Sequence, residues 1–180
     1  MLSAKMIDKL NEQVTLELYS ANLYLQMSSW CAYKGLENCA AFLLDQSKEE
    51  MDHMYRLFDY INDTGGQARL GAVEQPDHRF ESLHDLFEST LDHERKVTRA
   101  INELAELSFT EKDFSSFNFL QWYVAEQHEE EKLFKTILDK VDLIGMEGRG
   151  LYHIDIEVGK IARLNPKMPM ETAVDEGAIP

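Results

Sequence analysis

The sequence is short of proline, of cysteine and of long apolar runs. None of its four prolines precedes Pro76, so nothing breaks helix formation over the first 75 residues. No apolar stretch approaches the roughly 20 residues that a membrane-spanning helix requires. The two cysteines, Cys31 and Cys39, fit small buried thiols, which favours a reducing compartment. These absences predict a helical protein without a membrane segment.

Positive charge is also scarce, and charges appear early in the chain. Lys5, Asp8 and Lys9 arrive too soon for the apolar core of a signal peptide, so we expect a cytoplasmic protein. The chain has 33 acidic and 18 basic residues, and its formal net charge is −15. This surplus of acid argues against nucleic acid and anionic membranes as partners. It fits a protein that handles cations, although solubility alone would also explain it.

Glycines and capping residues mark the helix boundaries. A capping side chain satisfies free N–H groups in the first turn, and glycine readily adopts the conformation that ends a helix. The residues that fit these roles are Ser3, Gly35, Gly65, Ser82 with Asp85, Thr110 with Asp113, and Gly145. The helices expected from them cover residues 3–34, 37–64, 82 onward, 110–145 and, as a short fifth helix, 151–164.

The loop lengths predict how these helices are arranged. Short connections make the first two helices antiparallel, and likewise the third and fourth. Residues 65–81 are loop-like and could span roughly 55 Å when extended, enough to travel the length of a bundle. We therefore predict an all-α fold, a four-helix bundle with a long crossover between its second and third helices plus a short fifth helix. It forms one domain of residues 1–164, followed by a flexible tail at 165–180.

Each long helix has an apolar face that polar residues interrupt near the helix midpoint. Glu50 and His53 are three residues apart, so they share one face of the second helix and can hold one ion together. Each interruption lies within about five residues of its midpoint, or roughly 7 Å along the axis. Helix midpoints meet in one layer of a bundle whatever the helix directions. The residues expected in this buried layer are Glu17, Glu50, His53, Glu94, Gln127 and Glu130.

Four buried carboxylates require a compensating positive charge. Burying an isolated charge costs several kcal/mol, and neighbouring carboxylates repel one another. Lys48, Arg56, Arg95 and Lys96 fall off the apolar faces, so no basic residue is placed to neutralise the layer. Bound metal ions explain it better than a hydrated polar layer. Oxygen-rich ligands with an imidazole suit iron or manganese at paired sites, whereas a structural zinc site would favour cysteine and histidine.

Several residues beside the layer have more than one interpretation. Tyr24 points inward and could be a hydrogen-bond donor, a one-electron donor to the metals, or an ordinary core tyrosine. Trp122 could pack in the core or relay electrons. Glu49, Glu126 and Glu129 lie just off the core faces. They form either a solvated face or an extra cation site on the path in or out.

The chain resembles bacterial non-haem ferritins over about residues 1–163. The resemblance rests on the helix lengths, on the long crossover, and on the residues that follow in order along the chain. These are Glu17, Glu50-x-x-His53, Glu94 and Gln127-x-x-Glu130, with stretches such as Leu16-Glu-Leu-Tyr-Ser and Phe117-Asn-Phe-Leu-Gln-Trp-Tyr-Val. It implies a ferritin-like 24-subunit shell that oxidises Fe(II) with O2 or H2O2 and stores a ferric mineral.

The resemblance also implies a role for each site residue. Glu17, Glu50 and His53 would hold a first iron, with Glu50 bridging to the second. Glu94 and Glu130 would hold that second iron, with Gln127 close by. A third iron site would comprise Glu49, Glu126, Glu129 and Glu130, and Tyr24 would be the tyrosine associated with oxidation.

Two other functions are compatible with the same fold. Bacterioferritins bind haem through a methionine, and Met51 occupies the matching position. They also carry a second Glu-x-x-His in the fourth helix, where this chain has Gln127-x-x-Glu130. We therefore expect no haem and interpret Met51 as interface packing. A diiron peroxide reductase would form a small oligomer without a mineral. The starved-cell miniferritins lack a fifth helix and do not match.

Overall fold

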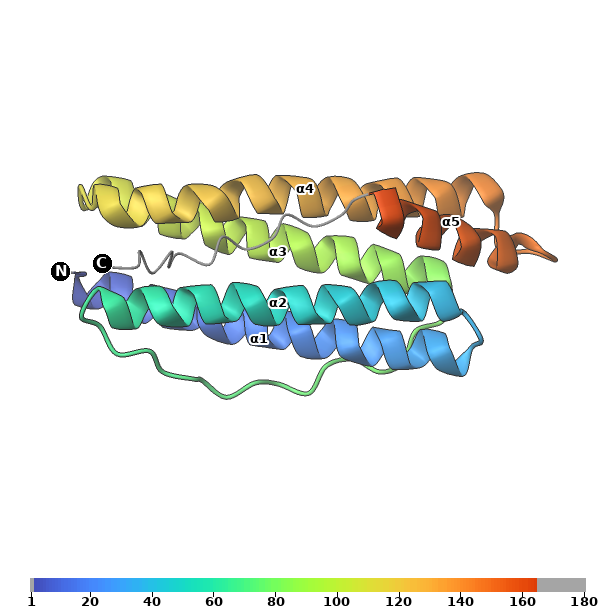
Figure 1. Ribbon diagram of the computed structural model, residues 1–180, viewed down its shortest axis with the longest axis horizontal. Helices are drawn as coiled ribbons and strands as arrows, with labels where there is room; N and C mark the ends of the chain where they lie inside the picture. Colours follow the sequence, from blue (N-terminus) through green and yellow to red (C-terminus); the bar gives the residue numbers. More distant parts are fainter. Residues whose placement is uncertain (1, 165–180) are drawn as a thin grey trace, which may run out of the picture.

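The computed structural model describes residues 2–164, which form five helices (Figure 1). They are α1 (Ala4–Tyr33), α2 (Glu37–Asp63), α3 (Leu83–Thr110), α4 (Phe114–Ile144) and α5 (Gly150–Leu164). The first four lie side by side along the long axis, and short α5 packs against α2 and α4 at one end. None of these helices is long and apolar enough to cross a membrane. The predicted bundle is confirmed, whereas the tail predicted at 165–180 lies outside the described residues.

The crossover between α2 and α3 runs the length of the bundle, so these two helices point the same way, as predicted (Figure 1). Its first part is fastened to α1. The Asn11 side-chain amide donates a hydrogen bond to the Gln67 carbonyl at 3.2 Å. The Arg69 N–H donates to the Asn11 Oδ1 atom at 2.6 Å, and its guanidinium pairs with Asp8 at 2.5 Å. The crossover is therefore an ordered strap and not a loose insertion.

The boundaries of α1 follow the predicted capping residues. The Ser3 hydroxyl accepts a hydrogen bond from the Met6 N–H at 3.0 Å. At the other end, Gly35 has a φ of 75°, and the Leu36 N–H donates to the Cys31 carbonyl at 2.9 Å. This closing pattern needs a left-handed residue, which glycine provides without steric cost. The turn brings α2 back antiparallel to α1.

The start of α4 lies later than predicted. Thr110 is the last residue of α3, and Lys112 makes the turn with a φ of 56°. Asp113 then caps α4, because its carboxylate accepts a hydrogen bond from the Ser116 N–H at 3.1 Å. The pairing of Thr110 with Asp113 suggested a capping box, but Asp113 is itself the capping residue.

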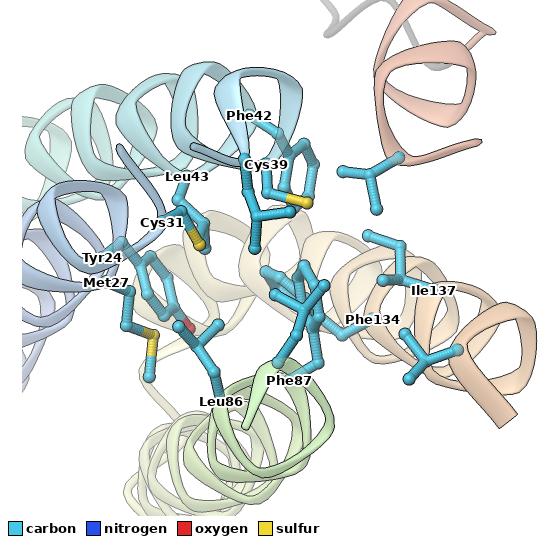
Figure 2. Packing of buried hydrophobic residues seen from close by; sticks show 14 of the residues in the cluster. Tyr24, Met27, Cys31, Cys39, Phe42, Leu43, Leu86, Phe87, Phe134 and Ile137 are labelled. Carbon is cyan, nitrogen blue, oxygen red and sulfur yellow. The ribbon is translucent and has the colours of Figure 1, made fainter. Parts of the chain in front are cut away.

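The core consists of two apolar clusters separated along the bundle axis. One contains Tyr24, Phe42, Phe87 and Phe134, which converge from four helices in Figure 2. The other contains apolar residues from the opposite halves of the same helices: Met6, Leu10, Val14, Leu57, Ile61, Val97, Ile101 and Leu120. Ile7, Tyr60 and Ile144 are only partly buried. The polar residues of the predicted layer fall between the two clusters.

The four long helices are not equally spaced. Cα atoms of α1 and α3 approach within 8 Å, but in the described chain no Cα atom of α2 comes that close to α4. Larger side chains therefore fill the space between α2 and α4. Among them are Trp122 and Tyr123, which meet the His53 ring edge to face at 5.2 and 6.1 Å between ring centroids.

Helix α5 is attached to the start of α2 through Asp155, which is buried. One carboxylate oxygen accepts the Cys39 N–H at 2.9 Å, and the other accepts the Asn38 side-chain amide at 2.8 Å. The residue at the N-cap position of α2, Leu36, has no side-chain acceptor. Asp155 therefore supplies from α5 the capping group that α2 lacks.

Candidate metal centre

All six residues predicted for the polar layer are buried together in the middle of the bundle. Each of the six is at most 4 % exposed: Glu17, Glu50, His53, Glu94, Gln127 and Glu130. They come from all four long helices, because each helix presents its apolar face inward and the polar residues occupy that face. The predicted convergence is therefore present.

Glu17, Glu50 and His53 form a group within this layer that could hold a cation. One ligand atom from each lies within 4.8 Å of the other two, close enough for a single cation to contact all three. The Glu50 Oε2 atom is 3.6 Å from His53 Nδ1. Gln13 donates to one Glu17 oxygen at 2.8 Å, while the other Glu17 oxygen is buried with no hydrogen-bond partner. An unpartnered buried carboxylate oxygen is an open position for a cation.

On the other side of the layer, neutral donors hold Glu94. The Tyr24 hydroxyl donates to one Glu94 oxygen, and the Gln127 amide donates to the other at 2.9 Å. Of the interpretations offered for Tyr24, the structure provides the hydrogen-bond donor directly. Gln46, from α2, donates to both oxygens of Glu130 at 3.2 Å. Both oxygens of Glu94 and both oxygens of Glu130 thus accept hydrogen bonds from neutral donors.

Burial shifts the protonation of the layer. It raises the pKa of Glu17, Glu50 and Glu130 well above the ordinary carboxyl value, and repulsion among the carboxylates raises these pKa values further. Burial likewise raises the pKa of Glu94 to about 7, although the hydrogen bonds from Tyr24 and Gln127 oppose the rise. No lysine or arginine of the described chain is buried. A cation would therefore displace protons and stabilise all four carboxylates.

A second group lies just outside the first. Glu49, His53 and Glu126 each offer a ligand atom within 4.8 Å of the others, and both carboxylates are half-buried. Glu129, predicted to join them, is exposed. Burial raises the pKa of Glu126, and the Glu129 charge raises it further, so Glu129 acts on this group through its field. The structure thus brings His53 into this outer group, and the prediction that Glu129 and Glu130 also belong to it stays a prediction.

Sequence reasoning missed the residues that hold the ligands. Gln13 and Gln46 each lie four residues before a predicted ligand, Glu17 and Glu50, and so one helical turn away on the same face. That spacing was the available signal. Tyr123, on α4, donates to the His53 carbonyl at 2.8 Å. Trp122 packs edge-on against the His53 ring, as expected of a packing residue.

The chain matches the family model described as a ferritin-like domain over residues 7–144. It is 54% identical to the bacterial non-heme ferritin of Escherichia coli O6:H1, over 92% of this chain and 100% of that protein. A bacterial non-heme ferritin of Campylobacter jejuni is 51% identical, over 90% of this chain and 97% of that protein.

Solved structures are similar over nearly the same span. An open pore ferritin from the hyperthermophilic archaeon Archaeoglobus fulgidus superposes with a TM-score of 0.86 and 42% identity, covering 88% of this chain and 98% of that one. A ferritin from Chlorobium tepidum superposes with a TM-score of 0.80 and 49% identity, covering 89% and 98%.

Proposed function

The chain belongs to the ferritin-like family, and from that premise we propose that it stores iron by oxidising Fe(II) in the buried layer. The oxidant is O2 or H2O2, and the ferric product is kept as a mineral inside a shell of 24 copies in the cytoplasm. The relatives named as bacterial non-heme ferritins support storage, and the ferritin neighbours support a homo-oligomer.

One observation carries the proposal. Four carboxylates and an imidazole share a buried layer in which no buried lysine or arginine of the described chain balances their charge. Carboxylates with one histidine suit iron in both oxidation states. The raised pKa values mean that the site holds protons until a cation arrives, so binding Fe(II) releases protons and becomes weaker in acid.

We assign the residues as two neighbouring subsites for Fe(II) as substrate. Glu17, Glu50 and His53 hold the first ion, and Glu50 also reaches the second, held by Glu94 and Glu130. Each Fe(II) would give one electron to the oxidant, and the residues of the two subsites would bind two such ions within one buried layer.

Neutral groups and an outer site complete the assignment. Tyr24 and Gln127 orient Glu94 through the hydrogen bonds described above. Glu49 and Glu126 bind a third ion on the route between solvent and the buried layer, with Glu129 and Glu130 as the further ligands expected from the family. No step requires haem, and Met51 packs against the apolar cluster that contains Met6 and Leu57.

Rapid mixing of Fe(II) with O2 tests the assignment. We expect Glu17→Ala and Glu130→Ala each to slow the fast phase of Fe(II) oxidation severely, because each removes an anionic ligand from one subsite. Glu106→Ala, on the exposed face of α3, is the matched control and should oxidise Fe(II) at the wild-type rate. Wild-type kinetics in either site variant would contradict the assignment.

The oligomeric state tests the storage role separately. A size-exclusion column should show a particle near two dozen chains that accumulates ferric mineral. A small oligomer without mineral would instead support a diiron peroxide reductase. A visible haem spectrum of the purified protein would support the bacterioferritin-like alternative.

A further inference from the structure

Gln46 occupies a special position between the two candidate groups. It lies on α2, is fully buried, and points its side-chain amide towards both a buried and a half-buried carboxylate. Its Nε2 atom lies 3.2 Å from both oxygens of Glu130 and 3.2 Å from the Glu49 Oε2 atom. Its own carbonyl oxygen, Oε1, is buried with no hydrogen-bond partner.

The buried Oε1 atom of Gln46 lacks a hydrogen-bond donor, which needs a physical explanation. A buried carbonyl without a donor costs free energy, and most buried polar groups avoid that cost. Gln46 tolerates it because its N–H2 group donates to two carboxylates at once, those of Glu130 and Glu49. Turning the amide round would place a partial negative charge against two acidic groups. That reversed orientation becomes favourable when a cation lies between them.

We propose that Gln46 is a cation-responsive positioning residue of the site. Without metal, its N–H2 group takes the place of a cation between Glu130 and Glu49. When Fe(II) binds between these carboxylates, the amide turns round and Oε1 becomes a neutral oxygen ligand. This inference rests on the proposed function, since it concerns the passage of the same Fe(II) between the outer group and the buried layer.

Two substitutions separate this role from a merely structural one. Gln46→Leu removes both the donor and the oxygen, whereas Gln46→Glu removes the donor but keeps an oxygen and adds a negative charge. Gln46→Glu adds a charge that tightens cation binding in either case, so the sign of the Gln46→Leu effect decides. If Gln46 acts only as a donor to Glu130 and Glu49, Gln46→Leu removes a group that competes with the cation, and both variants tighten Fe(II) binding. If Oε1 is a ligand, the two variants change Fe(II) affinity in opposite directions.

Anaerobic titration calorimetry of the assembled wild-type protein with Fe(II) measures the number of ions bound per chain and their affinities. For the ion that binds between Glu130 and Glu49, we expect Gln46→Leu to weaken binding about 10-fold and Gln46→Glu to tighten it about 10-fold. Changes of this size are typical of groups around a metal site. The ion held by Glu17, Glu50 and His53 should keep its affinity. Gln121→Leu and Gln121→Glu are matched controls, because Gln121 lies on the exposed face of α4 and its amide contacts only the Phe117 carbonyl.

Each outcome has a distinct meaning. Shifts of the same sign in both Gln46 variants, or no shift in either, would overturn the inference and leave the proposed function standing. Failure of wild-type protein to bind any Fe(II) would overturn both. Should Gln46→Glu fail to assemble, wild-type crystals soaked in Co(II) decide the question. We expect an ion within about 2.2 Å of the Gln46 side-chain oxygen, and an ion there with the amide still bonded to Glu130 would refute the switch.

Discussion

Replacing Glu94 with glutamine should make the metal-free protein more stable while making it a poorer catalyst. Glu94 is fully buried, and burial raises its pKa from the ordinary 4.5 to about 7. Ionising this carboxyl in the folded state therefore costs about 3 kcal/mol above neutral pH. Glutamine occupies the same volume without a charge. Its amide group would face the Gln127 donor, which removes about 1 kcal/mol of the gain.

The gain should depend on pH in a defined direction. Below pH 4.5 the carboxyl is protonated in both the folded and the unfolded chain, so its charge costs nothing. Between pH 4.5 and 7 the unfolded chain ionises first, and the penalty on the folded state grows. Above pH 7 the penalty is complete. Glu94→Gln should therefore stabilise the protein by about 2 kcal/mol at pH 8, whereas at pH 4.5 only the unfavourable contact with the Gln127 donor remains and the variant should be up to about 1 kcal/mol less stable.

Differential scanning calorimetry of metal-stripped protein measures this effect. A gain of about 2 kcal/mol corresponds to a rise of about 4–8 °C in Tm for a chain of this size, at fixed chain concentration and scan rate. Glu106→Gln, an exposed change on the same helix, should leave Tm unaltered at both pH values. The reasoning is refuted if Glu94→Gln gives no rise at pH 8, or the same rise at pH 4.5. In parallel, the fast phase of Fe(II) oxidation should fall, because the second subsite loses an anionic ligand.

Two further predictions concern residues away from the metal centre. Burial raises the pKa of Cys31 to about 12 and that of Cys39 higher still. Iodoacetamide at pH 8 should therefore label neither thiol until the protein unfolds. Mass spectrometry of protein labelled in the native and in the denatured state measures this. Labelling of the native protein would contradict their burial. Lys112 adopts a left-handed conformation, so Lys112→Gly should raise the unfolding free energy by about 0.5–1 kcal/mol, seen as a higher Tm. An unchanged or lower Tm would show that the turn carries no such strain.

The buried layer could be predicted because each polar residue stands where helical periodicity requires an apolar one. Glu17 and Glu94 interrupt otherwise apolar faces, and a bundle places the midpoints of those faces together. Helix ends were predictable where a glycine stood at the left-handed position, as at Gly35. The turn at Lys112, between α3 and α4, was harder to predict. Lysine rarely takes the left-handed conformation, so the residue type gave no signal.

The contacts around the ligands could not be predicted from spacing alone. The spacing places Gln46 near Glu50, but the structure directs its amide to Glu130 on another helix. That direction depends on side-chain torsions and on the wide spacing of α2 and α4, which only the packed bundle determines. For a similar reason Glu129 is exposed. It is the neighbour of Glu130 along α4, and adjacent residues of a helix point in different directions. Glu130 therefore points into the bundle while Glu129 points to solvent.

The contact between Asp155 and Cys39 also bears on the order in which the chain folds. Its two ends are 116 residues apart, so closing it carries an entropy cost that the tight turn at Gly35 avoids. During synthesis the first turn of α2 leaves the ribosome long before its acceptor on α5 exists. We therefore expect the start of α2 to fray in the nascent chain and to become stable only when α5 docks. Helix α5 thus completes α2.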